Sequence, residues 1–333
     1  MRGNQETILQ LKQLKVLFPQ RKQWIPAVDG VNLSITEGEI VGIVGESGSG
    51  KSVMSQSILR LKEHGFSVRY EGEIIFEGED LLKRRLSKMR EIRGNKISVI
   101  FQDPLNSLSP VHTVEKQLGE VLMLHKKISR ADTKERILEL LTITGISDPK
   151  GCMKKYPYEL SGGMQQRVMI AMALACEPKL LIADEPTTAL DVTVQEQILC
   201  LIRELNEKLK MSVLFISHDM GTVLQLCHSV KVMYLGEIVE EATTKQLFEQ
   251  PRHPYSKGLL ACIPHLEVKR GEPLPTIKGR VPSLSQIPKG CHFCTRCEEA
   301  DKICHTIEPP MIEVEQGHLV KCWKYTQVDN GKG

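Results

Sequence analysis

Gly45-Glu46-Ser47-Gly48-Ser49-Gly50-Lys51-Ser52 is the stretch that decides the fold of this chain. It follows an apolar run, residues 40–44, and precedes a segment with helical character, residues 53–61. A strand, a glycine-rich turn and a helix in this order are what a phosphate-binding P-loop requires. The glycines let the backbone N–H groups and the N-terminus of the helix face negative charge. The stretch therefore predicts a nucleotide-binding site.

Each position of this loop has an expected task. The loop residues expected to line the bound phosphates are Gly45, Ser47, Gly48 and Gly50. Lys51 would reach the β- and γ-phosphates, and Ser52 would supply a hydroxyl group to Mg²⁺. Phe18 or Trp24 precedes the loop at a distance that would let an aromatic ring stack on adenine, although an ordinary core or surface role is the alternative for either ring. We assign the stacking role to Phe18.

Length and composition indicate an ordinary globular protein. A length of 333 residues is sufficient for two domains. A composition of 41% hydrophobic and 26% charged residues is typical of a soluble chain. A net charge of +3 gives no global field that would favour nucleic acid. The longest apolar run, residues 168–176, is far short of a membrane span, and the N-terminus shows no secretion signal. We therefore expect a protein that is made and kept in the cytoplasm.

Two carboxylates end a second apolar strand. Residues 180–183 are followed by Asp184 and Glu185. In a P-loop ATPase such a strand end supplies the acid that holds Mg²⁺, here Asp184, and the residue that acts on the attacking water, here Glu185. A further buried strand, residues 212–217, leads to His218. Because the ends of parallel strands form one edge of a sheet, we expect these three side chains to belong to the nucleotide site.

A second helix start has the features of an anion site. Ser161 is a candidate N-cap for a helix that includes residues 168–175. Gly162 and Gly163 leave N–H groups open at the positive end of that helix. A plain helix cap is the alternative interpretation.

Local patterns predict the remaining elements. Residues 7–18 and 27–35 alternate as strands do, and residues 231–239 form a hairpin. The basic stretch 81–93 is expected to be a helix. Between residues 110 and 160 apolar side chains recur at helical spacing without a strand signal, which predicts a small helical insertion.

Taken in order, these motifs resemble those of the nucleotide-binding subunit of ABC transporters. The match runs through about residues 7–250 and uses GESGSGKS, Gln102, LSGGMQQR, LLIADEP, Ala189-Leu190-Asp191 and Ser217-His218. The resemblance implies that Gln102 senses the γ-phosphate, helps to hold Mg²⁺ and couples to membrane subunits. It also implies that Asp191 crosses a dimer interface and that His218 is the switch histidine.

The same resemblance implies a nucleotide that is sandwiched between two protomers. Ser161, Gly162 and Gly163 would clamp the ATP that is bound at the P-loop of the opposite protomer. Met164 departs from the family pattern, because most of the superfamily carries Gln at this position. Since Met164 still lies at the beginning of the helix, we expect little loss of function.

A narrower resemblance covers the tail. Residues 251–260 (PRHPYSKGLL), followed by Gly290-Cys291 and Arg296-Cys297, are similar to the peptide/nickel importer branch of this family. In that branch paired, paralogous ATP-binding subunits lie under two membrane permease subunits, which an extracellular substrate-binding protein feeds. The resemblance therefore implies a peripheral protein at the cytoplasmic face of the cell membrane. It leaves dipeptides, oligopeptides, nickel and metal chelates open as cargo.

Five cysteines lie close together near the end of the chain: Cys291, Cys294, Cys297, Cys304 and Cys322. In a reducing compartment such a group is expected to bind a metal rather than to form disulfides. The first three are spaced as in ferredoxins. Some members of the importer branch carry a [4Fe–4S] cluster on a pattern that matches Cys291, Cys297, Cys304 and Cys322, and we prefer this set, which leaves Cys294 as an extra thiol. Zinc on the same residues and unligated surface thiols are the alternatives.

The predicted fold is α/β: a P-loop ABC-type ATPase core with an antiparallel β subdomain, a helical subdomain and a small C-terminal metal-binding extension. We place the ATPase domain at residues 1–250, the helical subdomain at about 103–165 and the extension at 251–333. A proline- and glycine-rich linker, residues 264–290, lies within the extension. A soluble ABC ATPase that acts on nucleic acid or ribosomes is the rival, but a single P-loop and a short span between Gln102 and the LSGG motif do not fit it.

Overall fold

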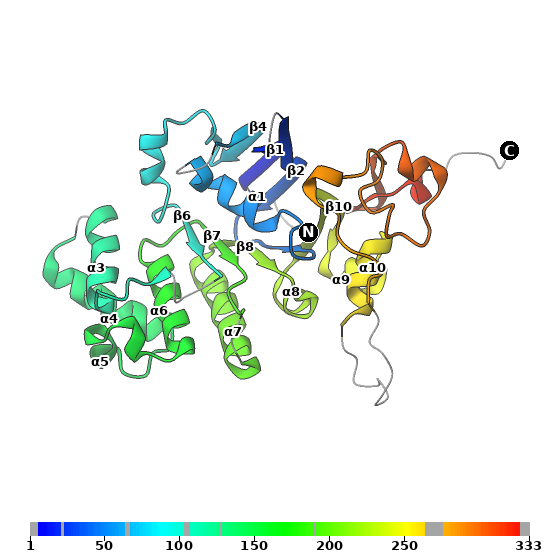
Figure 1. Ribbon diagram of the computed structural model, residues 1–333. Helices are drawn as coiled ribbons and strands as arrows, with labels where there is room; N and C mark the ends of the chain where they lie inside the picture. The colour runs from blue at the N-terminus through cyan, green and yellow to red at the C-terminus, as the bar shows by residue number, and fades with distance from the viewer. Residues whose placement is uncertain are drawn as a thin grey trace. The chain divides into compact units, whose positions relative to one another are not determined.

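The structure is a computed structural model that describes residues 6–20, 23–63, 67–102, 107–126, 128–188, 191–263 and 276–326 (Figure 1). The chain forms two compact units. The first consists of Met1–Ile8, Ile35–Ile40 and Phe76–Ile216, and the second of Leu9–Ser34, Val41–Ile75 and Ser217–Gly333. Both units are built from segments far apart in the sequence, so neither is a continuous stretch of chain.

A parallel sheet with the strand order β8-β7-β6 forms the core of the first unit. Its strands are β6 (Ile97–Ile100), β7 (Leu180–Asp184) and β8 (Ser212–Ser217). Every residue of β7 and β8 is buried, as is usual for parallel strands that are covered on both faces. The apolar runs 180–183 and 212–217 therefore form strands, as predicted.

Helices make up most of the rest of the first unit (Figure 1). They are α3 (Val114–His125), α4 (Arg130–Ile143), α5 (Pro149–Lys154), α6 (Gly162–Leu174) and α7 (Val192–Leu209), with the 3₁₀ helix η3 (Pro157–Glu159). The side chains of Thr113, Ser129 and Asp148 accept backbone hydrogen bonds at the starts of α3, α4 and α5. The predicted insertion between residues 110 and 160 is therefore helical.

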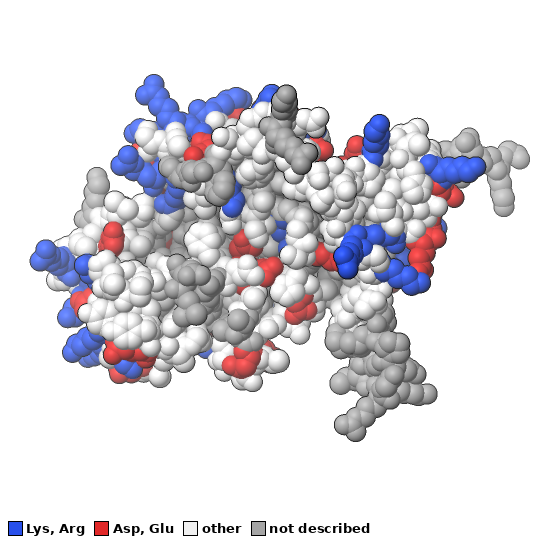
Figure 2. Space-filling view, viewed as in Figure 1, with Lys and Arg blue, Asp and Glu red and all other residues white. Residues whose placement is uncertain are grey.

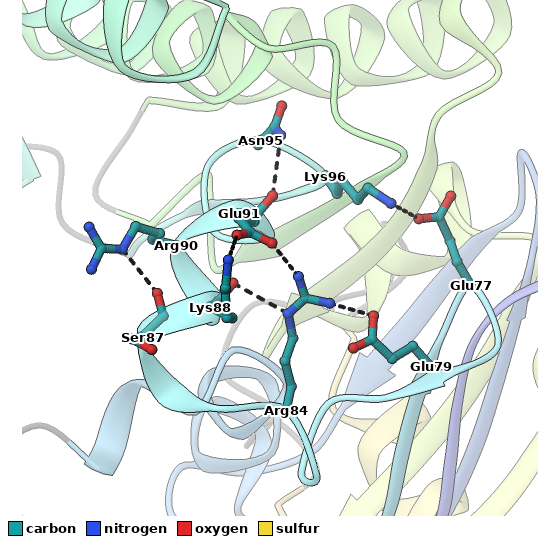
Figure 3. A network of polar contacts seen from close by, with 9 residues as sticks. All are labelled: Glu77, Glu79, Arg84, Ser87, Lys88, Arg90, Glu91, Asn95 and Lys96. Atoms are coloured by element: carbon teal, nitrogen blue, oxygen red, sulfur yellow. Dashed lines mark hydrogen bonds and ion pairs between the residues drawn. The ribbon is translucent and has the colours of Figure 1, made fainter.

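The basic stretch 81–93 is not the continuous helix that we predicted. It follows the short strand β5 (Glu79–Asp80), and within it only Leu86–Glu91 is helical, as the 3₁₀ helix η2. Figure 3 shows that the Arg84 guanidinium donates to the Glu79 and Glu91 carboxylates, each at 2.5 Å. These pairs are largely exposed and contribute little stability, whereas Leu81, Met89 and Ile92 of the same segment are buried.

The second unit contains two groups of hydrogen-bonded strands. One has the order β2-β1-β4, and the other has the order β11-β12-β10-β9-β3. The strands are β1 (Thr7–Gln20), β2 (Gln23–Thr36), β3 (Ile40–Val44), β4 (Arg69–Phe76), β9 (Ser229–Tyr234), β10 (Glu237–Thr243), β11 (Met311–Glu315) and β12 (His318–Lys321). Only the β3–β9 pair of the second group is parallel, and β9 to β12 are joined in antiparallel pairs.

The helices of the second unit are short. They are α1 (Lys51–Ile58), α8 (Met220–Leu226), α9 (Thr244–Glu249) and α10 (Pro254–Ala261), with the 3₁₀ helices η1 (Leu61–Glu63), η4 (Leu284–Gln286), η5 (Lys302–His305) and η6 (Trp323–Tyr325). Of the predicted linker, residues 264–275 lie outside the described residues, and η4 is the regular element of the rest. No described helix has the length and apolar character that a membrane crossing needs.

The last described strands are built into the second unit through β10. β12 pairs with β10, with Val320 opposite Glu240. The His318 and Glu240 side chains are both fully buried, and His318 Nε2 lies 2.7 Å from Glu240 Oε1. The Glu240 carboxylate also accepts the N–H groups of Arg252 and His253 at 2.7 and 2.8 Å. One buried carboxylate therefore joins β10, the start of α10 and β12, and satisfies its own hydrogen-bonding capacity in doing so.

His253 is predicted to make the stability of this unit depend on pH. Its Nδ1 accepts the N–H of Tyr255 at 3.1 Å, and the residue is 1% exposed. Burial, with a smaller contribution from the charge of Lys257, lowers the pKa of His253 from 6.5 to about 3. Since the unfolded chain takes up a proton near the ordinary pKa, the stability is complete above that pH and falls as the pH drops toward 3, by about 1.4 kcal/mol per pH unit.

We expect His253→Asn, which keeps a cap acceptor, to reduce this dependence. The free energy of unfolding, measured by urea denaturation between about pH 6.5 and pH 5, should fall less steeply in the variant than in the wild type. Equal slopes would contradict the assignment.

Candidate functional site

The glycine-rich loop, residues 45–52, connects β3 to α1 in the second unit. Gly50 is the N-cap of α1 and has a φ of +102°. A Cβ atom on Gly45 would lie 2.1 Å from the carbonyl oxygen of Met233 in β9. A side chain cannot be accommodated there because the obstacle is backbone in the middle of a sheet. The loop therefore packs its own backbone against β9, as a close phosphate-binding turn requires.

The Lys51 ammonium is enclosed by the loop. Its Nζ donates to the carbonyl oxygens of Gly45 and Glu46 at 2.7 and 3.0 Å, and the residue is 6% exposed. Ser52 follows in the first turn of α1 and is half-buried. A cation beside the N–H groups of a helix start is an arrangement that binds phosphate.

The tip of the loop is open to solvent. Ser47 and Gly48 are exposed, and a Cβ atom on Gly48 would meet no atom within 4 Å. His218 is exposed as well, and it lines a cavity of about 160 Å³ together with Gly45. The structure thus brings His218 to the base of the P-loop within the second unit.

The two candidate adenine-stacking rings lie in this unit. Phe18 is half-buried near the end of β1, and Trp24 near the start of β2 is 44% exposed. Either ring has surface available for stacking on a base. The assignment of Phe18 stays a prediction.

Glu46 has a role that the sequence did not reveal. Its backbone N–H donates to the hydroxyl oxygen of Tyr255 at 2.7 Å, and its carboxylate accepts two hydrogen bonds from Arg296. Both partners belong to the stretches that suggested the importer branch, but no local spacing connects Glu46 with a residue 250 positions later.

The carboxylates predicted for catalysis lie in the first unit. Asp184 ends β7 and is 3% exposed. Glu185 follows with a φ of +51°, and its N–H donates to the Ile216 carbonyl at 2.9 Å. A left-handed residue other than glycine costs about 1 kcal/mol or more, and such residues gather at functional sites. The hydrogen bond to Ile216 holds Glu185 in this conformation.

Two neighbours hold the Glu185 carboxylate. Gln102 Nε2 and the Thr188 hydroxyl group donate to the same Oε2 atom at 2.8 and 3.0 Å. The structure therefore brings together two of the predicted catalytic residues, Gln102 and Glu185. The residues that follow Gln102, 103–106, lie outside the described part of the chain.

Ser161 is the N-cap of α6. Its side chain accepts the N–H of Met164 at 3.4 Å. Ser161 and Gly162 are exposed, and a Cβ atom on Gly163 would lie 3.1 Å from Val194 of α7. The residue is thus a helix cap, and the exposure of this helix start leaves it accessible to a ligand that another molecule carries.

Asp191 has a similar capping role in the same unit. Its carboxylate accepts the N–H of Val194 at 3.0 Å at the start of α7. The other members of this motif, residues 189 and 190, lie outside the described residues. The expected position of Asp191 at a dimer interface stays a prediction.

The five cysteines of the tail line one cavity of about 560 Å³: Cys291, Cys294, Cys297, Cys304 and Cys322. None of them forms a disulfide. Burial raises the pKa of Cys291 to about 12 and also raises the pKa of Cys294, Cys297 and Cys322, so these thiols stay protonated in the absence of a metal. Among the described residues no group of three or more His, Cys, Asp or Glu side chains is arranged to hold a metal ion.

Two family models match the chain. The model described as ABC transporter covers residues 28–188, and the model described as oligopeptide/dipeptide transporter, C-terminal region, covers residues 239–304. The second match contains four of the five cysteines of the tail, and Cys322 lies beyond it. The two models thus cover separate stretches of the sequence, one with the P-loop and one with most of the cysteine group.

Curated relatives are similar over nearly the whole chain. The oligopeptide transport ATP-binding protein OppD of Bacillus subtilis is 48% identical over 95% of this chain and 88% of its own length. A second oligopeptide transport ATP-binding protein of Bacillus subtilis, AppD, is 46% identical over 96% of this chain and 98% of its own length. Among solved structures, the dimeric ATP-binding cassette MJ0796 in a post-hydrolysis state bound to ADP and Pi matches with a TM-score of 0.64. It shares 31% identity and covers 71% of this chain and 99% of its own.

The packing of the loop against β9 predicts that its glycines differ in their tolerance to substitution. Gly45→Ala should lower the free energy of unfolding by about 3 kcal/mol, because the new methyl group collides with a backbone carbonyl. Gly48→Ala is the matched control, since its methyl group enters open space and only the positive φ costs about 1 kcal/mol. Urea denaturation of the nucleotide-free variants measures both. Equal losses would mean that the Met233 carbonyl does not restrict the loop.

Proposed function

Because this chain belongs to the ATP-binding proteins of ABC transporters, and among them to the peptide transport proteins, we propose that it drives the import of dipeptides or oligopeptides through a membrane transporter. The match of residues 239–304 to the C-terminal region of oligopeptide and dipeptide transporters carries this proposal. The names of OppD and AppD support peptides rather than nickel or metal chelates as the cargo.

The reaction that powers this import is ATP hydrolysis, since the family to which the chain belongs consists of ATPases. We assign phosphate binding to the P-loop N–H groups and to Lys51, whose ammonium lies against the loop carbonyls. Mg²⁺ would be held by the Ser52 hydroxyl group, the Asp184 carboxylate and Gln102. Oxygen ligands of this kind are those that Mg²⁺ prefers.

Glu185 is proposed to activate the attacking water. The water oxygen would attack the γ-phosphorus in line, its proton would go to the Glu185 carboxylate, and the bond to the leaving β-phosphate oxygen would break. His218 would contact the γ-phosphate region. Gln102 donates to Glu185 in this structure, which places its amide beside the carboxylate that would accept the proton.

The remaining half of each site is proposed to come from a second ATP-binding subunit. The exposed start of α6, with Ser161 as its cap, supports this because it offers N–H groups to the nucleotide of a partner. The relative MJ0796 forms a dimer. We propose a paralogous ATP-binding partner, two membrane permease subunits and an extracellular substrate-binding protein, with this chain bound peripherally at the cytoplasmic face.

The rival function on nucleic acid has less support. Acidic side chains lie among the basic ones over the face that Figure 2 shows, and the net charge is only +3. A nucleic-acid-binding surface usually concentrates Lys and Arg on one face. Co-purification with permeases rather than with nucleic acid would agree with the proposed function.

The substitution Glu185→Gln tests the catalytic assignment. ATP turnover should fall by about 100-fold or more, because the general base is lost, whereas ATP binding and ATP-dependent dimerisation should remain. Lys51→Ala serves as the contrasting variant, in which ATP binding itself should be lost. Turnover near the wild-type level in Glu185→Gln would remove this residue from its assigned role.

We further propose a [4Fe–4S] cluster on Cys291, Cys297, Cys304 and Cys322. The cavity that these thiols line supports it. A zinc ion on the same residues is the alternative; among the described side chains no group of three or more is arranged to hold a metal ion of either kind. When bound, the cluster would link four points of a tail that has little apolar core of its own.

Metal analysis tests this proposal. Protein purified without oxygen should contain about four iron and four sulfide per chain. Cys322→Ser should abolish that content and Cys294→Ser should keep it, because Cys294 lines the same cavity but is not among the proposed ligands. One zinc and no sulfide would replace the cluster by a zinc site, and a metal-free tail would contradict both.

A further inference from the structure

An ion pair joins the P-loop to the cysteine-rich tail within the second unit. Arg296 Nη1 and Nη2 donate to the two carboxylate oxygens of Glu46 at 2.5 and 3.0 Å. The Arg296 side chain is 3% exposed and that of Glu46 is 30% exposed. A fork of this kind is strong and directional, in contrast to an exposed pair, which contributes little.

Other contacts hold the Arg296 guanidinium in place. Its Nε donates to the Lys278 carbonyl at 3.0 Å, and Nη1 lies 3.4 Å from the Tyr234 hydroxyl oxygen. The guanidinium carbon is 5.8 Å from the ring centroids of both Tyr234 and Phe293, within the range of cation–π attraction. Arg296 therefore meets Glu46 in an orientation that Lys278 and Phe293 of the tail and Tyr234 of β9 have already set.

Tyr255 contacts the same P-loop residue from α10. Its hydroxyl oxygen accepts the Glu46 N–H at 2.7 Å. The Tyr255 ring is fully buried and packs 4.7 Å from Tyr234 and 5.3 Å from Phe293, measured between ring centroids. The backbone and the side chain of Glu46 are thus both held by residues that follow position 250 in the chain.

Glu46 in turn determines where the phosphate-binding lysine lies. The Glu46 and Gly45 carbonyls accept hydrogen bonds from Lys51 Nζ. A shift of Glu46 would move one of these carbonyls and the loop N–H groups beside it. The contacts of Arg296 and Tyr255 therefore reach the phosphate site through one residue.

We propose that Arg296 and Tyr255 are positioning residues for nucleotide binding, which hold Glu46 so that the P-loop has its phosphate-binding shape before ATP arrives. This inference rests on the assignment of the P-loop as the ATP site. A loop that is ordered in advance loses less entropy when its ligand binds, so the two residues act on the affinity for MgATP and not on the chemical step. On this basis, residues of the cysteine-rich tail support ATP binding through their contacts with Glu46.

A double-mutant cycle on the full chain tests the proposal. Arg296→Lys keeps the charge but loses the fork, and Glu46→Gln keeps the shape but loses the charge. Each should raise the Kd for MgATP, measured by isothermal titration calorimetry, about tenfold. The double variant should bind no more than about twofold more weakly than either single one, because both changes break the same contact. KM for ATP should rise with Kd while kcat stays within about twofold.

Control variants separate this proposal from a general loss of stability. Lys245→Ala removes an exposed pair with Glu249 in the same unit, at 3.9 Å, and should leave Kd unchanged. Tyr255→Phe removes only the hydroxyl group and should also weaken MgATP binding, which keeps the test available if Arg296→Lys does not fold. A lower thermal midpoint with an unchanged Kd, or a kcat loss with an unchanged KM, would overturn the proposal, as would additive effects in the double variant.

Lys51→Ala distinguishes failure of this inference from failure of the proposed ATP site. If Lys51→Ala loses MgATP binding while Arg296→Lys and Tyr255→Phe bind as the wild type does, only the positioning role is wrong. If Lys51→Ala binds MgATP normally, the P-loop assignment fails and this inference fails with it.

Discussion

The second unit depends on one constraint: a loop of backbone N–H groups and one ammonium must keep its shape next to a highly charged ligand, with no side chain in between. Such a loop cannot stabilise itself by apolar burial, because its inner surface has to remain polar and open. It is held from outside instead. β9 lies against Gly45 so closely that a methyl group would collide with a carbonyl oxygen. On the other side, Tyr255 and Arg296 hold Glu46.

In the first unit, a strained backbone conformation at Glu185 positions a functional side chain. Glu185 has to point away from the strand that carries it, and its left-handed backbone turns the chain immediately after Asp184. The hydrogen bond from its N–H to Ile216 of β8 maintains this conformation. The buried parallel strands supply the rigidity, since all residues of β7 and β8 are enclosed. The apolar sheet thus supports a conformation that an isolated segment would avoid.

The tail is an integral part of the second unit. The buried Glu240 connects β10, the start of α10 and β12, so removal of the tail would leave a carboxylate without partners in an apolar interior. The aromatic contacts among Tyr234, Tyr255 and Phe293 then set the position of Arg296. A segment with cysteines and few apolar residues has in this way become part of the support for the P-loop.

Much of the fold could be predicted from local sequence. The P-loop with its strand and helix, the apolar strands that end at Asp184 and lead to His218, and the helices between residues 110 and 160 all follow from the periodicity and spacing of neighbouring residues. The prediction failed for residues 81–93, where Arg84 pairs with Glu79 and Glu91. The composition there is compatible with a helix, but the apolar side chains Leu81, Met89 and Ile92 are buried in a segment that contains only a short 3₁₀ helix.

The sequence by itself therefore determined which functional motifs are present. A P-loop, a strand that ends in carboxylates and a capped helix are each encoded within a few consecutive residues. Only the tertiary structure decided which distant residues support them. Gln102 reaches Glu185 across 83 positions, and Arg296 reaches Glu46 across 250. No periodicity reports a contact of that kind, since it depends on how the strands and the tail are packed and not on the spacing of residues along the chain.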